Sequence, residues 1–161
     1  MLGHVKHAVT MNAEYARMHL EDVTSEQWCE QAEGLGMHPA SIVGHVAVNY
    51  AMVRMMLGDE LDLPDGWSDL FAGTAAATAE ASAYPAKDEL LAALADQRGR
   101  ILARLEAASA DDLAQPTPHE EARKFIPTVG DGLVLVLTIH EALHLGQLSA
   151  WRRAMALPLH V

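Results

Sequence analysis

The chain has 161 residues, of which 50% are hydrophobic, and its 22 acidic and 11 basic side chains give a formal net charge of −11. This length fits one domain, residues 1–161, and the acidic balance excludes ready binding to nucleic-acid phosphates. The single cysteine, Cys29, excludes an internal disulfide and a multi-thiolate metal site. Because only 5% of the residues are aromatic, helices packed on helices are favoured over a sheet.

Four segments are predicted to be amphipathic helices. The first covers about residues 2–20, and the second runs from Pro39 to Leu57, with the proline in a first turn where its missing N–H is harmless. The third covers about 86–108, and the fourth about 130–156. The residues expected to face inward are Val5, Val9, Ala13, Ala16 and Leu20; Ile42, His45, Asn49, Met52 and Met56; Leu91, Leu94, Ile101 and Leu105; and Leu133, Val136, Leu137, His140, His144, Gln147 and Trp151.

Two polar connections separate these helices. Residues 61–85 form a long connection between the second and third helices, and Trp67, Leu70 and Phe71 give it apolar contacts. Residues 109–129 contain three prolines and are expected to be loop. Four helices with one long crossover predict an all-α four-helix bundle.

The sequence also bears on location. Its N-terminus lacks the long apolar core of a signal peptide. No window of about twenty apolar residues is apparent, because the apolar run from Leu133 to Ile139 continues directly into histidine and glutamate. We therefore expect a cytoplasmic protein that does not associate with membranes.

Two histidines, His140 and His144, lie four residues apart in the otherwise apolar fourth segment. Four residues advance a helix by roughly 400°, so both imidazoles fall on one face, one turn apart. A single buried histidine is usually a hydrogen-bonded core residue. Two together need partners for four ring nitrogens, which a shared transition-metal ion would help to satisfy. The pair therefore favours a metal site.

A third candidate ligand, His45, lies in the middle of the second helix's apolar face. Bundles build metal sites from side chains on facing helices, and three imidazoles would leave a coordination position open for water or substrate. The ion is expected to be a divalent transition metal, with zinc or nickel favoured and iron and copper also suited. The histidines expected to be exposed and not to bind metal are His4, His7, His38, His119 and His160.

Three further polar residues each have two interpretations. Asn49, one turn beyond His45, either holds a ligand or water or lies partly exposed at the edge of its face. Arg98 either extends its guanidinium to solvent or pairs with an anionic substrate. Glu141 completes the H-E-x-x-H pattern in which zinc peptidases use the glutamate to activate water. Against that reading, no strand is predicted, and Glu141 lies about 80° off the inward axis of an ideal helix.

The segment Ser41–Val46 (SIVGHV) and the closing motif His140-x-x-x-His144-x-Gly146-Gln147 resemble the DinB-like (YfiT-like) superfamily of metalloenzymes. The resemblance covers nearly the whole chain, although Gly44 stands where many relatives carry a larger residue. It implies an up-down-down-up bundle, often dimeric, with a divalent metal on the residues matching His45, His140 and His144. Characterised relatives include thiol-dependent isomerases and S-transferases that use mycothiol or bacillithiol.

We therefore expect a metal-dependent enzyme acting on a small molecule, which activates a low-molecular-weight thiol for S-transfer or isomerisation. One alternative is a metal-dependent hydrolase with bound hydroxide as its nucleophile. Another is a non-catalytic, metal-binding dimeric bundle. In each case a homodimer is expected and nucleic acid is not a partner.

Overall fold

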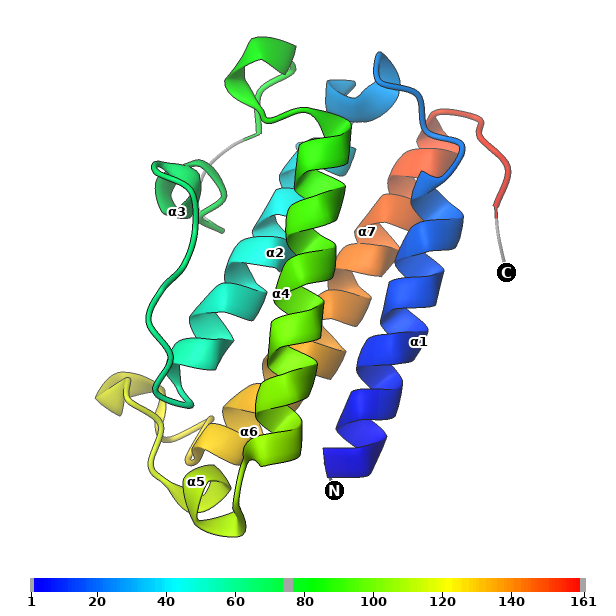
Figure 1. The fold of residues 1–161 in the computed structure, drawn as a ribbon. Coiled ribbons are helices and arrows are strands. Elements are labelled where there is room, and N and C mark those ends of the chain that lie inside the picture. The colour runs from blue at the N-terminus through cyan, green and yellow to red at the C-terminus, as the bar shows by residue number, and fades with distance from the viewer. Residues whose placement is uncertain (1, 74–76, 160–161) are drawn as a thin grey trace.

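The computed structural model describes residues 2–73 and 77–159, and four long helices form a bundle (Figure 1). Among the described residues there is no strand, and the only strand-like pairing is an isolated bridge between Pro116 and Thr128. The predicted all-α fold class is confirmed. The long helices are α1 (Leu2–Leu20), α2 (Pro39–Met55), α4 (Lys87–Ala107) and a continuous closing helix made of α6 (Val129–Val134), the π-helical segment η4 (Leu135–His140) and α7 (Glu141–Ala154).

The bundle has an up-down-down-up course. In the view of Figure 1, α1 runs upward, α2 and α4 both run downward, and the closing helix runs upward. Because α2 and α4 are parallel, the chain must return along the whole bundle between them, and residues 56–86 make this return. The predicted course and the long second connection are both confirmed.

Short helical turns interrupt both long connections. The expectation that residues 109–129 are all loop is wrong, since two short helical elements lie there. The first starts because Ser109 and Asp112 form a capping box, in which each side chain accepts from the other residue's N–H. The short elements are η1 (Gln27–Cys29), α3 (Trp67–Leu70), η2 (Ala81–Ala83), α5 (Ala110–Ala114) and η3 (Glu120–Ala122).

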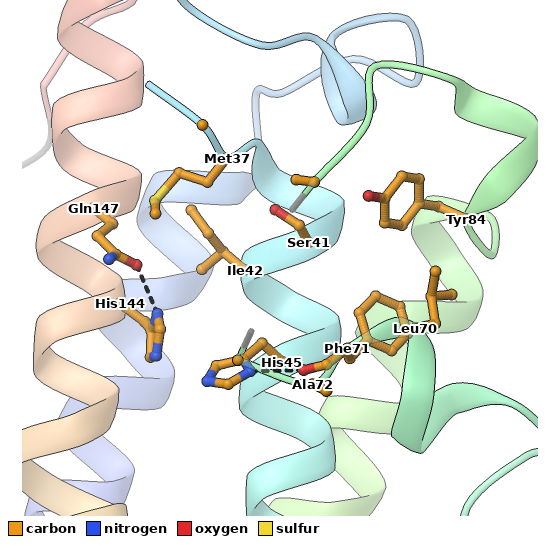
Figure 2. Close-up of a pocket in the computed structure, with 13 residues that line it drawn as sticks. Met37, Ser41, Ile42, His45, Leu70, Phe71, Ala72, Tyr84, His144 and Gln147 are labelled. Carbon is orange, nitrogen blue, oxygen red and sulfur yellow. Dashed lines mark hydrogen bonds between the residues drawn. The ribbon is translucent and has the colours of Figure 1, made fainter. Parts of the chain in front are cut away.

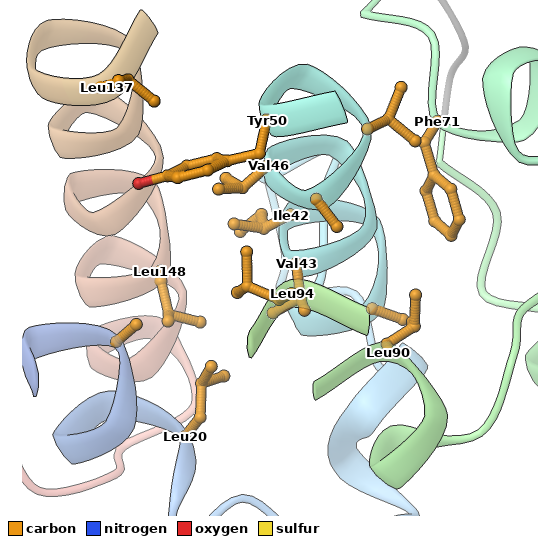
Figure 3. Packing of buried hydrophobic residues seen from close by; sticks show 14 of the residues in the cluster. Leu20, Ile42, Val43, Val46, Tyr50, Phe71, Leu90, Leu94, Leu137 and Leu148 are labelled. Atoms are coloured by element: carbon orange, nitrogen blue, oxygen red, sulfur yellow. The ribbon is translucent and has the colours of Figure 1, made fainter. Parts of the chain in front are cut away.

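The core lies between the four long helices, where branched aliphatic side chains from all of them meet (Figure 3). The expected inward faces are correct for α1 and largely correct for α4, where Leu90 is buried and Leu91 half-buried. On α2 the expectation fails at Met52, which is 49% exposed. That helix is apolar almost all round, so its sequence does not define a single inward face.

The closing helix passes a simple test for a membrane span. By length and composition alone, Val129–Ala154 would suffice to cross a bilayer, which corrects the expectation that no such stretch exists. One such helix is weak evidence, because bundle helices of soluble proteins meet the same criteria. Here the helix packs along α1 and α2 as the fourth member of the bundle (Figure 1).

Candidate metal centre

The imidazoles of His45, His140 and His144 converge where α2 faces the closing helix. Nε2 of His140 lies 3.1 Å from Nε2 of His45 and 3.1 Å from Nε2 of His144. One nitrogen of each ring lies within 4.8 Å of the others, and all three rings are half-buried. The structure thus brings together all three residues that the sequence put forward as ligands.

Hydrogen bonds fix the tautomers of two of these rings. Nδ1 of His45 lies 2.8 Å from the carbonyl oxygen of Phe71, and Nδ1 of His144 lies 2.7 Å from Oε1 of Gln147. Since an oxygen of this kind only accepts, both Nδ1 atoms must carry hydrogen and donate it. In the neutral rings, both Nε2 atoms therefore present lone pairs to His140. Figure 2 shows the two rings and these bonds.

Burial favours the neutral form of His140 and His144. It lowers the pKa of His144 to about 4, helped by the neighbouring His140 and His45, and it also lowers the pKa of His140, with His45 again contributing. A neutral His140 carries at most one hydrogen, so its Nε2 cannot donate to both lone pairs. A cation placed where the three nitrogens meet would accept these lone pairs.

Asn49 does not donate a hydrogen bond to the Nε2 lone pair of His45. Its Nδ2 donates to the carbonyl oxygen of His45 at 2.8 Å. The same atom lies 3.1 Å from Nε2 of His45 but also 3.4 Å from Nδ1, so it sits over the face of the ring and not along the Nε2 lone pair. Asn49 is half-buried, which agrees with the interpretation that places it at the edge of its face.

The donor set fits a divalent transition metal. Imidazole nitrogens bound to zinc at 2.0–2.1 Å in a tetrahedron lie about 3.3 Å apart. This is close to the 3.1 Å that separates Nε2 of His140 from Nε2 of His45 and from Nε2 of His144. Three neutral nitrogen donors suit zinc, nickel, iron and copper alike. The second nitrogens of His45 and His144 are already held by protein oxygens, which is the usual way in which metal-binding imidazoles are oriented.

Phe71 reaches His45 because Gly44 has no side chain. A Cβ at Gly44 would stand only 2.1 Å from Cε1 of the Phe71 ring. The ring therefore occupies the place of a side chain on α2, and the adjacent backbone carbonyl meets the imidazole one residue further on. This explains the small residue before His45.

A cavity of about 160 Å³ opens beside His45 and His144, between α2, the closing helix and the crossover (Figure 2). Its walls combine apolar side chains with three polar ones besides the histidines, namely Ser41, Tyr84 and Gln147. The lining residues are Gly36, Met37, Ser41, Ile42, His45, Leu70, Phe71, Ala72, Gly73, Ala77, Tyr84, His144 and Gln147.

Glu141 turns away from the three imidazoles into the centre of the bundle, where it is 1% exposed. The hydroxyl of Tyr50 donates to its Oε2 at 2.6 Å, Nδ2 of Asn12 donates to the same atom at 3.1 Å, and Arg98 forms an ion pair with Oε1. Burial and the Glu141 carboxylate raise the pKa of Tyr50, so the hydroxyl remains a donor. With its carboxylate held by three donors, Glu141 is not placed as the water-activating base of a peptidase.

Both interpretations of Arg98 are wrong, since its guanidinium neither extends into solvent nor lines the cavity beside the imidazoles. It pairs with Glu141 and lies 5.9 Å from the centroid of the Tyr50 ring. The sequence did contain a signal for this pair. Arg98 falls between Leu94 and Ile101 in the series of residues expected to face inward on the third helix, and Glu141 lies in a nearly uncharged segment. Each of these side chains needs an opposite charge if it is buried.

The remaining histidines differ partly from expectation. His4, His7 and His119 are exposed as expected, while His160 lies outside the described residues. His38 was expected to be exposed, yet it is 0% exposed. Its Nδ1 accepts from the N–H of Ser41 at the start of α2, and its Nε2 lies 2.9 Å from the carbonyl oxygen of Thr78. His38 is buried because it contacts the crossover, which is distant in sequence.

Fold and site together define an all-α bundle with three imidazoles meeting between facing helices. A family model described as the DinB superfamily matches residues 8–148, and the chain belongs to that superfamily. No curated protein matches the chain. Among solved structures it is similar to YfiT from Bacillus subtilis, described as a probable metal-dependent hydrolase with an unusual four-helix bundle topology. That match has a TM-score of 0.68 and 19% identity, and it covers 98% of this chain and 89% of YfiT.

Proposed function

We propose that this protein is a metal-dependent hydrolase whose divalent ion is held by His45, His140 and His144. The single observation that carries the proposal is the meeting of two Nε2 lone pairs at the Nε2 of a third neutral imidazole, which a cation would relieve. The likeness to YfiT supports the choice of hydrolysis. Zinc and nickel are the ions we favour.

The chain's own side chains have distinct parts in such a reaction. A divalent ion held there would supply an acidified water molecule and polarise a carbonyl group. Phe71 and Gln147 hold two of the rings in place through their oxygens, and the cavity beside the rings provides space for a substrate. Among the described residues that line the cavity there is no Asp or Glu, so none of them would act as a carboxylate general base beside the ion. An ion that itself lowers the pKa of water makes such a base unnecessary.

Elemental analysis tests the ion directly. We expect a stoichiometric transition metal in the purified protein and none in His45→Ala, because two imidazoles on one helix turn cannot complete the site. His119→Ala, which removes an exposed histidine, is the matched control and should keep the full metal content. Hydrolysis of uncharged short-chain esters should follow the metal content across the three proteins. Equal metal in wild type and His45→Ala would refute the site.

Thiol S-transfer or isomerisation is the second candidate function. The absence of Asp and Glu from the cavity lining favours a nucleophile that ionises readily, and a thiol bound to a divalent metal does so. Consumption of a model electrophile only in the presence of mycothiol, bacillithiol or glutathione would establish this function over hydrolysis. Ester turnover without any thiol would establish the first.

We propose further that the chain is a cytoplasmic homodimer, paired through the face formed by α1 and α7. Only 22% of the most apolar window of the closing helix is buried within one chain. Met11 and Tyr15 are large apolar side chains exposed on α1, where they line a cavity of about 440 Å³ shared with α7, and Leu143 is a third such side chain exposed on α7. Covering this face with a second copy would remove it from water and from membranes alike.

A further inference from the structure

We propose that the cavity beside the three imidazoles selects a compact, uncharged substrate: an apolar group attached to a carbonyl-type oxygen. Substrates with a carboxylate or phosphate on that group should be rejected. This inference rests on the proposed metal site and names the class of molecule that the site accepts. It is carried by the charge, the hydrogen-bonding state and the size of the cavity lining.

The lining provides no partner for a charged substrate group. None of the described residues that line the cavity is Lys, Arg, Asp or Glu, and Met37, Ile42, Leu70 and Phe71 contribute apolar side chains to the wall (Figure 2). An anionic group bound there would lose its hydration without gaining a counter-charge. The metal ion could neutralise one anionic group that binds to it directly. The selection therefore acts against a charge on the part of the substrate that fills the cavity.

The polar side chains of the lining leave two donors for an oxygen, one hydroxyl and one amide. The Tyr84 hydroxyl accepts from the N–H of Thr78 at 3.0 Å, and its own hydrogen has no acceptor among the described residues. Ser41 is occupied, because its Oγ donates to the carbonyl of His38 at 2.8 Å and accepts from the N–H of the same residue. Gln147 has its Oε1 taken by His144 at 2.7 Å, which leaves its NH₂ group without an acceptor among the described residues. An amide NH₂ donates only, so it matches a carbonyl or ester oxygen.

The volume limits the size of the apolar group. The cavity holds about 160 Å³, close to the roughly 150 Å³ of engineered protein cavities that bind benzene. A branched group of four to six carbon atoms therefore fills it. The net charge of −11 acts in the same direction as the lining, because the field of an acidic protein lowers the local concentration of anions.

A pair of isosteric metal-binding ligands tests the inference through binding. The hydroxamate of 4-methylpentanoic acid ends in an isopropyl group, whereas succinic monohydroxamate ends in a carboxylate of nearly the same shape. Titration calorimetry on the zinc-loaded protein should show the uncharged ligand binding at least about tenfold more tightly, as expected for an unpaired buried charge. Equal affinities, or tighter binding of succinic monohydroxamate, would overturn the inference.

Substitution of Met37 provides an independent test. Met37→Lys places a cation in the wall and should shift the affinity ratio towards succinic monohydroxamate by about tenfold. Met37→Gln is the control of similar length without charge, and it should keep the wild-type preference. A ratio that is the same in both variants would contradict the inference. Both of these tests measure binding and not turnover. Metal-loaded protein that discriminates between the two ligands but hydrolyses no ester would therefore refute the proposed hydrolase and leave the proposed selectivity standing.

Discussion

Single residues decide how the centre of this bundle is held together. Glu141 and Arg98 form an ion pair that is almost entirely buried, and Tyr50 and Asn12 complete the hydrogen bonds of the carboxylate. Such a pair adds little net stability over a well-packed apolar pair, but breaking it leaves an uncompensated charge in the core. The pair is also adjacent to His140, so it fixes the rotation of the helix that presents two of the imidazoles.

Glu141→Ala should therefore destabilise the protein strongly. We expect the free energy of unfolding to fall by roughly 3–5 kcal/mol, because Arg98 loses its counter-charge. Urea denaturation followed by circular dichroism would measure the change. Glu106→Ala is the matched control: its carboxylate is 70% exposed in an ion pair with Lys6, and its loss should change stability by less than about 1 kcal/mol.

A second substitution separates a structural role from a catalytic one. Glu141→Gln keeps an oxygen acceptor for Tyr50 but cannot act as a base. If Glu141 only positions the helix, this variant should retain its metal and its residual activity should follow its metal content. Full metal content with complete loss of ester hydrolysis would instead restore the peptidase-like interpretation of the motif.

At the scale of whole elements, the start of α2 is tied to the crossover by one histidine. Because Nδ1 of His38 accepts from Ser41, its Nε2 carries the hydrogen and donates to the carbonyl of Thr78. The ring also meets Tyr84 edge-on, with centroids 4.6 Å apart. Protonation of Nδ1 would remove the acceptor that caps the helix.

Stability should accordingly fall in mild acid through His38. Burial lowers the pKa of His38 below its ordinary value of 6.5. The unfolded chain therefore binds a proton at a higher pH than the folded chain, so the contribution is fully present above about pH 6.5 and is lost as the pH falls through the folded pKa. Urea midpoints at pH 7.5 and pH 5.5 should differ less in His38→Asn, which keeps a capping acceptor, than in wild type. Identical pH dependence in both would contradict this role.

The elements also show where sequence reasoning succeeded and where it stopped. Helical spacing located the long helices and placed His45, His140 and His144 on inward faces, because a period of 3.6 residues is a local property. The same spacing correctly turned Glu141 away from the imidazoles, but it could not identify Tyr50, Asn12 and Arg98 as its partners, because they are distant in sequence. His38 was misassigned because its partner, Thr78, is distant in sequence.

At the scale of the whole molecule, the face formed by α1 and α7 governs assembly. Leu143 is 63% exposed on α7, and Phe125, in the connection between α5 and α6, is 79% exposed. A homodimer that uses the α1–α7 face should depend on Leu143 and not on Phe125. The strongly acidic net charge opposes association, so the apolar contact must outweigh it.

Leu143→Glu should convert the protein to monomers, whereas Phe125→Glu should leave the dimer intact. Analytical ultracentrifugation at several protein concentrations would measure the association. Both variants add one negative charge, so a difference between them reports the site of the contact. A monomeric wild-type protein, or equal weakening by both substitutions, would refute pairing through this face.

The contact between Gly44 and the Phe71 ring has a consequence for how the centre could be lost. The oxygen that orients His45 belongs to the crossover and not to any helix of the bundle. A displacement of the crossover from α2 would therefore remove the acceptor of Nδ1 of His45. The orientation of one imidazole thus depends on a segment outside the four packed helices.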